Sequence, residues 1–186
     1  MHKYVLIYFL NCALVMFFKI KKSDGYNYSK RSGDFNDIHI KELVGYNSIY
    51  GDIICHGCNI FEKSLGIINL KKKIKNYNQI SFTLKKYFAY ESEISILKKK
   101  NKTEYNLLQN KELKGTISLN KKKAIKINLR KFKFTKININ LKNKNKIQAL
   151  NKLLQEVSKY VGMTYPGRNS GIESIIINYN PDSNKS

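Results

Sequence analysis

The chain is poor in the residues from which most enzyme sites are built. It has no tryptophan, three cysteines, three histidines and two prolines. With His2, His39 and His56 as the only histidines, a Ser-His-Asp arrangement cannot be inferred. No glycine-rich phosphate loop follows a predicted strand, and no repeat has solenoid spacing. Glu91 and Glu93 are paired carboxylates, but neighbouring lysines indicate surface charge. These absences argue against an enzyme, and we predict no catalytic residue.

Cysteine gives one sharp local motif, Cys55-His56-Gly57-Cys58. Two cysteines at this spacing can form a reducible disulfide, so a secreted thiol-redox protein is one alternative. A thioredoxin-like site also needs a proline opposite the cysteines, and only Pro166 and Pro181 exist. A zinc site would have at most three close ligands and no second pair. We therefore predict no metal and no cofactor, and we interpret the pair as incidental strand cysteines.

Acidic residues are also unevenly distributed. The chain has 35 Lys and Arg against 13 Asp and Glu, a formal net charge of +22, and residues 113–155 contain no acid before Glu156. Within this stretch Ile125, Ile127 and Leu129 alternate with polar residues, which is the period of a half-buried strand. A sheet with one apolar and one cationic face would suit a polyanion. A/T-rich codons also favour lysine, so a merely solvated surface is the alternative.

The first 37 residues are interpreted as an address. Residues 4–18 form an apolar run that is too short to cross a bilayer comfortably, so 1–18 are predicted to be a signal peptide. Residues 19–37 are basic and transit-like, similar to the bipartite address of proteins sent to a plastid of secondary origin (apicoplast-type). Secretion, a mitochondrial location and an uncleaved anchor are alternatives, and we expect no stable membrane association after leader removal. The domain follows at 38–163, with a tail at 164–186.

The domain is predicted to be mainly β. Strands are expected over 46–55, 60–70, 77–84, 103–109 and 112–119, then over three further segments between 125 and 141. Residues 85–97 fit either a short helix or a strand. From Ile147 the apolar residues recur at spacings of three and four, which predicts an amphipathic helix ending near Met163. A short strand is expected at 175–177. Short connections favour antiparallel pairing.

The order of these segments resembles the Whirly family of organellar single-stranded-DNA-binding proteins. The similarity rests on SIYGDII at 48–54, QISFTL at 79–84, SEISIL at 92–97, and the closing helix with YVGM at 160–163. The family's K-G-K-A-A-L lysines are absent, since Gly51 and Asp52 stand there, and Met163 replaces its tryptophan. That motif is therefore not carried over.

The resemblance implies two packed antiparallel four-stranded sheets closed by the C-terminal helix. It also implies a homo-oligomer, possibly a tetramer, that binds single-stranded DNA or RNA with little sequence preference. Bases would stack on aromatic rings beside lysines that follow the phosphates. An organellar ribosomal or RNA-associated structural protein is the alternative. The predicted nucleic-acid-binding residues are Tyr77, Lys85, Lys86, Tyr87, Phe88, Tyr90, Lys126, Arg130, Lys131 and Lys133.

Overall fold

The strands that the structure describes form one sheet. The computed structural model describes residues 7–10, 13–71, 74–100, 103–121, 146–164 and 172–178. Among these residues seven strands are joined in the order β1-β2-β4-β5-β6-β3-β7, and every neighbouring pair is antiparallel. The strands are β1 (Ile7–Leu10), β2 (Ala13–Lys19), β3 (Gln79–Leu84), β4 (Glu93–Lys98), β5 (Glu104–Gln109), β6 (Glu112–Asn120) and β7 (Ser174–Asn178).

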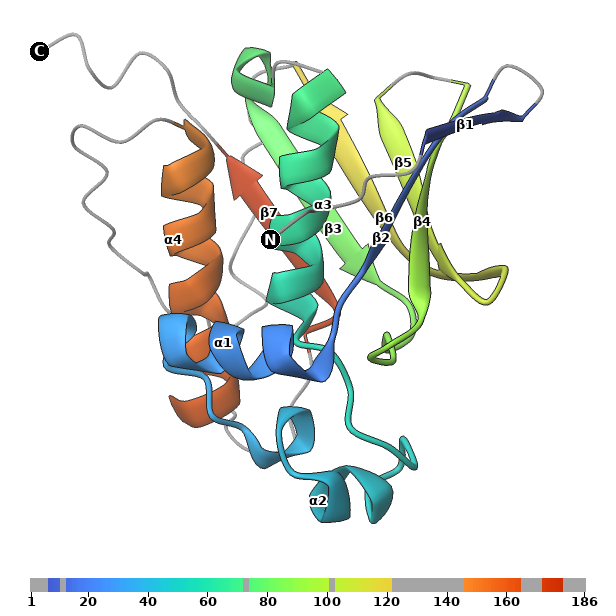
Figure 1. Ribbon diagram of the computed structural model, residues 1–186. Coiled ribbons are helices and arrows are strands. Elements are labelled where there is room, and N and C mark those ends of the chain that lie inside the picture. The colour runs from blue at the N-terminus through green and yellow to red at the C-terminus, as the bar shows by residue number, and fades with distance from the viewer. Residues whose placement is uncertain are drawn as a thin grey trace, which may run out of the picture.

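Two long helices cover one face of this sheet (Figure 1). They lie side by side, α3 over the middle of the sheet and α4 beside β7, while α1 and α2 lie near one end of both. The helices are α1 (Lys22–Ser32), α2 (Glu42–Tyr46), α3 (Gly57–Lys71) and α4 (Lys146–Lys159), with short 3-10 turns η1 (Asp37–His39) and η2 (Ile74–Asn76) and a π turn η4 (Tyr160–Thr164). No described helix is long and apolar enough to cross a membrane.

The prediction of two packed four-stranded sheets is therefore wrong. Residues 60–70, expected as a strand, belong to helix α3, and residues 46–55 contain only an isolated bridge between Ile54 and Ala89. The reason lies in how α3 is buried. Cys58, Phe61, Leu65 and Ile68 follow helical spacing, but Asn59, Ile60 and Ser64 are buried as well. Because α3 is enclosed on several sides, its apolar stripe is wide and resembles a continuous strand run.

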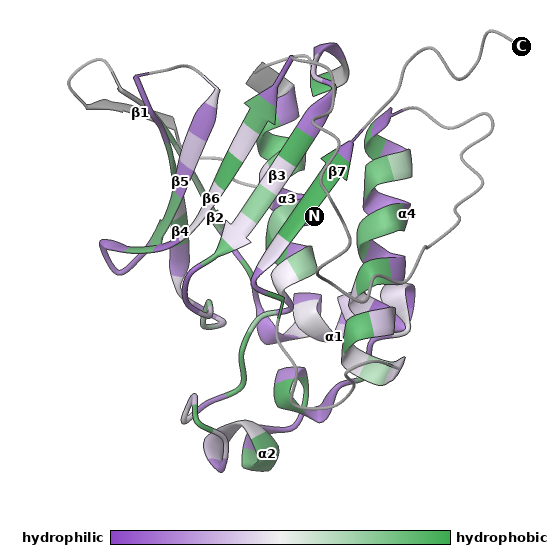
Figure 2. Cartoon of the chain, turned by 180° about the vertical axis from the view of Figure 1, so that it is seen from behind, coloured by the Kyte–Doolittle hydropathy of each residue, from purple (hydrophilic) through white to green (hydrophobic). Residues whose placement is uncertain are grey.

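The spacing of apolar residues correctly predicted several other strands and one helix. In β3 the buried Ile80 and Phe82 face α3, and the Phe61 and Phe82 rings stack with centroids 4.7 Å apart. The strands predicted at 103–109, 112–119 and 175–177 and the helix beginning near Ile147 are confirmed to within a few residues. In the ambiguous segment, Ile94 and Ile96 are buried in β4. Figure 2 shows hydrophobic residues gathered along β3, β7 and one side of α4.

Part of the predicted address lies within the sheet. Strand β2 pairs with β4 from Val15 opposite Leu97 to Lys19 opposite Glu93, and its Val15, Met16 and Phe18 are buried. Tyr28 of α1 is also completely buried. An apolar run of this length fits a core strand as well as a signal peptide. The division of the chain into leader, domain and tail, and the plastid-type location, stay predictions.

The hairpin between β5 and β6 gives a prediction about stability. Its two turn residues, Asn110 and Lys111, have φ angles of 52° and 63°, which is the backbone of a type I′ turn. Glycine adopts this conformation at no steric cost, so Lys111→Gly should raise the free energy of unfolding by about 0.5–1 kcal/mol. Lys98→Gly, made within β4, should lower it instead. Urea unfolding of both variants measures the difference, and destabilisation by Lys111→Gly would contradict this reading of the turn.

Candidate functional site

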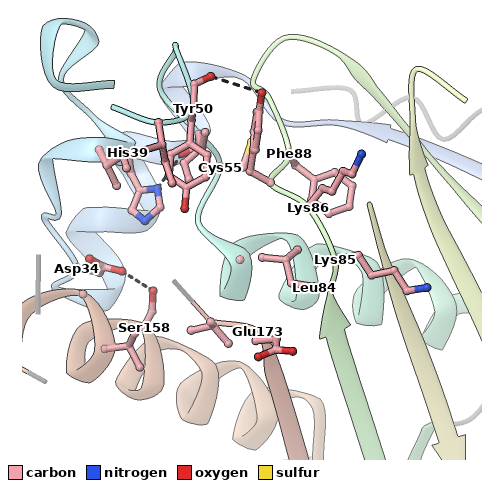
Figure 3. Close-up of a pocket in the computed structure, with 18 residues that line it drawn as sticks. Asp34, His39, Tyr50, Cys55, Leu84, Lys85, Lys86, Phe88, Ser158 and Glu173 are labelled. Atoms are coloured by element: carbon pink, nitrogen blue, oxygen red, sulfur yellow. Dashed lines mark hydrogen bonds between the residues drawn. The ribbon is translucent and has the colours of Figure 1, made fainter. Parts of the chain in front are cut away.

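A cavity of about 520 Å³ lies where the loop after β3, the end of α4 and the segment between α1 and α3 meet (Figure 3). Most of its wall is apolar, and four polar side chains other than lysine and tyrosine interrupt that wall: Asp34, His39, Ser158 and Glu173. The apolar residues include Ile38, Ile54, Leu84, Phe88, Val161 and Ile172. A concave, mostly apolar wall with a few convergent polar groups is the usual form of a small-molecule site.

Asp34 is held in place by groups on both sides of its carboxylate. Helix α1 ends at Gly33, whose left-handed φ of 76° turns the chain, and Asp34 follows with only 3% of its surface exposed. The Ser158 hydroxyl donates to Asp34 Oδ2 at 2.6 Å, and the Asn36 backbone N–H donates to Oδ1 at 3.2 Å. A charged group this buried requires such partners.

Gly162 leaves the space that the carboxylate occupies. A Cβ atom built on Gly162 would lie 2.2 Å from Asp34 Oδ1 and 2.7 Å from its Cγ. Atoms cannot approach so closely, so any side chain at this position would displace the carboxylate. Glycine is thus required here by close approach rather than by its backbone angles.

His39 lies in η1, five residues after Asp34, and lines the same cavity. Its Nδ1 is 2.8 Å from the carbonyl oxygen of Ile54. A carbonyl only accepts hydrogen bonds, so Nδ1 carries the ring proton and Nε2 of the neutral ring holds a lone pair. Burial lowers the pKa of His39 below its ordinary value, against the opposing effect of Asp34. His39 is therefore a neutral ring with a basic nitrogen at neutral pH.

His56 supports His39 from within the core. It is 1% exposed, and its imidazole ring lies against that of His39 with centroids 3.9 Å apart and planes tilted by 31°. His56 Nε2 lies 3.3 Å from the Asp34 carbonyl oxygen and 3.2 Å from Ser29 Oγ. Burial first, and then the neighbouring His39, lower the pKa of His56 well below the usual value. Protonation of this ring would place a charge in the core.

Tyr90 fixes the backbone of His39. Its hydroxyl donates to the His39 carbonyl oxygen at 3.2 Å and lies 3.5 Å from His56 Nδ1. Room for this hydroxyl exists because residue 25 of α1 is glycine: a Cβ there would lie 2.1 Å from it. The Asp34, His39 and His56 groups are thus positioned by α1, by α4 and by the loop after β3.

The three groups were considered as metal ligands. One ligand atom each from Asp34, His39 and His56 lies within 4.8 Å of the others, and both imidazoles are neutral. Zinc, however, needs nitrogen lone pairs that converge on one point about 2.0–2.1 Å away. Both ring nitrogens of His56 already face other polar groups, Nε2 the Ser29 hydroxyl and the Asp34 carbonyl oxygen and Nδ1 the Tyr90 hydroxyl, so this ring has no nitrogen directed to an ion shared with His39. The residues do not fit a shared ion unless one ring turns.

Cys55 and Cys58 lie next to the cavity, but their thiols do not have the properties of a redox centre. Cys55 and Cys58 are free and buried, and burial raises the pKa of both thiols strongly. A neutral thiol is a poor nucleophile, whereas redox catalysis needs a thiolate. The same motif nevertheless contributes to the cavity, because Gly57 begins α3 at the cavity wall. The first N–H groups of a helix have no intrahelical acceptor, and the helix dipole is positive there.

Several residues predicted to bind nucleic acid line this cavity. Lys85, Lys86, Tyr87 and Phe88 line it, and Tyr87 donates to the Tyr50 carbonyl oxygen at 3.4 Å. Phe88 and Tyr90 are buried, as is Tyr77 beside Lys146, so their rings offer no open stacking face. Lys86 and Lys114 share Glu112 as ion-pair partner. Lys126, Arg130, Lys131 and Lys133 lie outside the described residues.

The residues that form the site were not predicted. Asp34 fell within the predicted leader, and the three histidines were considered too few for catalysis. The available signal was local: an aspartate and a histidine within six residues, followed by a second histidine at a helix start. Nothing in that spacing alone shows that the segment folds back over α3.

Comparison with known proteins was made at the level of sequence and of structure. No family model and no curated protein matches the chain. Among solved structures it is similar to an (R)-hydratase from A. caviae involved in PHA biosynthesis, with 14% identity, 57% of this chain and 90% of that chain covered, and a TM-score of 0.43. An R-hydratase from Pseudomonas aeruginosa has 12% identity over 69% of this chain and 90% of that one, with a TM-score of 0.42.

A third similar structure is a MaoC-like dehydratase, with 10% identity over 63% of this chain and 40% of that one, and a TM-score of 0.44. These proteins are named as hydratases and dehydratases, whereas the described strands of this chain form one antiparallel sheet and not the two packed sheets that the Whirly resemblance implies. The Whirly resemblance is therefore wrong, and with it the predicted nucleic-acid function and the prediction of a non-enzyme. At such identities and TM-scores the similarity does not establish an activity.

The lowered pKa values of His39 and His56 predict how stability depends on pH. Their pKa values are lowered in the folded state, so the unfolded chain binds protons more readily near pH 6.5. The contribution of these two histidines to the free energy of unfolding should be present in full above pH 6.5 and should decrease as the pH falls below it. The slope should reach about 1.4 kcal/mol per pH unit for each histidine. Carboxyl groups change the pH dependence of stability only closer to their pKa values in the unfolded chain, which are about 4.

Urea unfolding at pH 7.5, 6.5 and 5.5 tests this expectation, because the interval lies above the carboxylate range. A free energy of unfolding that stays constant or rises toward pH 5.5 would contradict the lowered pKa values of His39 and His56 in the folded chain.

Proposed function

We propose that this chain is an enzyme that adds water to, or removes water from, a substrate whose carbon–carbon double bond is conjugated to a carbonyl group. Asp34 and His39 are its acid–base pair. One observation carries the proposal: a carboxylate and a basic imidazole nitrogen from one short segment both line an otherwise largely apolar cavity. The proposal rests on these side chains and not on the structural similarities.

The spacing of the pair suits a water molecule. The ligand atoms of Asp34 and His39 lie within 4.8 Å of each other. A water oxygen hydrogen-bonded to both at about 2.8 Å each would fit between them. A base this close to the water can take one of its protons, and the protonated base can then act as the acid that delivers that proton to the substrate carbon.

The chemistry then follows from the two protonation states. In hydration, His39 Nε2 removes a proton from the water while the oxygen bonds to the β-carbon of the substrate. The π electrons move toward the carbonyl oxygen, and the proton is returned to the α-carbon through the pair. In dehydration the same steps run in reverse. Asp34 orients the water, and Ile54 holds the proton on Nδ1 so that Nε2 remains the base.

The first turn of α3 suits the carbonyl group. Negative charge develops on the carbonyl oxygen during addition, and N–H groups at a helix start can stabilise it. Gly57 places this helix start at the cavity wall with no side chain of its own. The apolar wall would receive a hydrocarbon tail, and Lys85 at the rim would attract an anionic end of the substrate.

The first test is an assay of the purified full chain with the trans-2-butenoyl thioester of coenzyme A. Hydration removes the conjugated double bond, so the ultraviolet absorbance of the enoyl thioester should fall to an equilibrium value. Starting from one of the two enantiomers of the 3-hydroxybutanoyl thioester, and not from the other, should restore it. Release of free thiol without loss of the double bond would instead show hydrolysis and overturn the proposal. The absence of any reaction with the butenoyl thioester and with enoyl thioesters whose acyl chains are two to twelve carbons longer would also overturn it.

A further inference from the structure

We infer that Ser158 of α4 is a positioning residue for the Asp34 carboxylate, so that α4 forms part of the acid–base site. The role in catalysis rests on the proposed function, while the contact itself does not. Ser158 is 3% exposed, and its hydroxyl donates to Asp34 Oδ2 at 2.6 Å across 124 residues of sequence.

Asp34 depends on α4 more than on its own loop. The loop supplies one donor to the carboxylate, the Asn36 backbone N–H at 3.2 Å, which is longer and less strong than the contact from Ser158. One turn after Ser158, Gly162 leaves the volume in which the carboxylate lies. The end of α4 thus provides both the stronger hydrogen bond and the space, and these two features fix the direction of the carboxylate.

Substitution of Ser158 by alanine removes the hydrogen bond to Asp34 without leaving another charged neighbour unpaired. Its hydroxyl also faces Cys58 and Tyr28, both neutral because burial raises their pKa values. Tyr28 has its own acceptor in the Leu154 carbonyl at 3.4 Å. The titratable groups that face Asp34 from the packed elements are Tyr28, His39, His56, Cys58 and Tyr90.

Loss of the Ser158 hydroxyl should therefore act on the reaction rather than on substrate binding. Without this donor the carboxylate is free to turn, and displacement by about 1 Å can cost about 100-fold in rate. We expect Ser158→Ala to lower kcat by about 10-fold to 100-fold with KM changed less than about threefold.

Two controls separate positioning from simple packing. Ser158→Thr keeps the hydroxyl and should restore most of kcat. Ser64→Ala removes another completely buried serine, whose hydroxyl has no hydrogen-bond partner among the described residues. It should leave kcat unchanged. A fall in kcat equal for Ser158→Ala and Ser64→Ala, or a rise in KM at unchanged kcat in Ser158→Ala, would overturn the catalytic role.

A double-mutant cycle tests the contact without any assay of activity. The unfolding equilibrium constants of the full chain, Ser158→Ala, Asp34→Ala and the double variant should show a coupling of about tenfold or more, as for a hydrogen bond to a charged group. Effects that multiply to within about twofold would overturn the inference. Coupling in a chain that hydrates no enoyl thioester would reject the proposed function and retain Ser158 as the group that positions Asp34.

Discussion

Replacing either member of the acid–base pair should abolish most of the hydration activity. We expect Asp34→Asn and His39→Asn each to lower kcat by about 100-fold to 10,000-fold, the usual contribution of a general acid or base. The amide introduced by Asp34→Asn would keep the shape that Ser158 and the Asn36 N–H contact, but it carries no charge and accepts no proton. The amide introduced by His39→Asn can still donate to the Ile54 carbonyl, yet it has no basic nitrogen.

Asp37→Asn is the matched control for these variants. It removes a carboxylate from the same segment, and that carboxylate pairs with Lys41 at 3.1 Å rather than lining the cavity. Its kcat should stay within about twofold of the parent, because a surface ion pair contributes little. Near-normal kcat in Asp34→Asn with intact folding would contradict the assignment of the pair. The double variant should be little worse than either single one, since the two groups act as a unit.

Gly162→Ala should remove activity by displacing the carboxylate rather than by changing any reacting group. The added Cβ would lie 2.2 Å from Asp34 Oδ1, so Asp34 must leave its position between Ser158 and Asn36. We expect a loss of at least about 100-fold in kcat. The free energy of unfolding should fall by about 2–4 kcal/mol, since the buried carboxylate loses its partners.

Gly66→Ala gives the opposite expectation for the same change. Gly66 lies in α3, is exposed, and a Cβ there would meet nothing within 4 Å. Alanine is a better helix former, so this variant should gain about 0.5–1 kcal/mol of stability and keep its activity. Thermal unfolding and kcat measured side by side compare the two alanines. Equal behaviour of both variants would contradict the close approach at Gly162.

Strands and helices were predictable from the sequence where the element is buried on one face only, because the spacing of its apolar residues then shows the period of the element. Buried Ile80 and Phe82, like buried Ile94 and Ile96, alternate with less buried residues because the described helices all lie on one face of the sheet. Helix α4 lies at the side of the sheet, so its buried Leu150 and Leu154 form a narrow stripe at helical spacing. Helix α3 was mistaken for a strand because burial on several sides hides its period.

The site was not predictable from the same patterns. Its carboxylate comes from residue 34, its positioning hydroxyl from residue 158 and its required space from residue 162, and only the folded chain brings them together. Composition also pointed elsewhere. A surplus of lysine dominates the sequence, whereas the site uses one aspartate and two of three histidines. Local pattern reports which side of an element is buried, and it contains no information about contacts over such separations.

The most direct measurement of the central claim follows the α-carbon of the substrate. The purified chain is mixed with trans-2-butenoyl thioester in deuterium oxide, and proton NMR records the product. If Asp34 and His39 pass the proton of a bound water, the product should be the 3-hydroxybutanoyl thioester with one deuterium at the α-carbon in a single configuration, and Asp34→Asn should form it at least about 100-fold more slowly. Unchanged substrate, free butenoic acid, or deuterium in both configurations at a rate equal to that of Asp34→Asn would contradict the account.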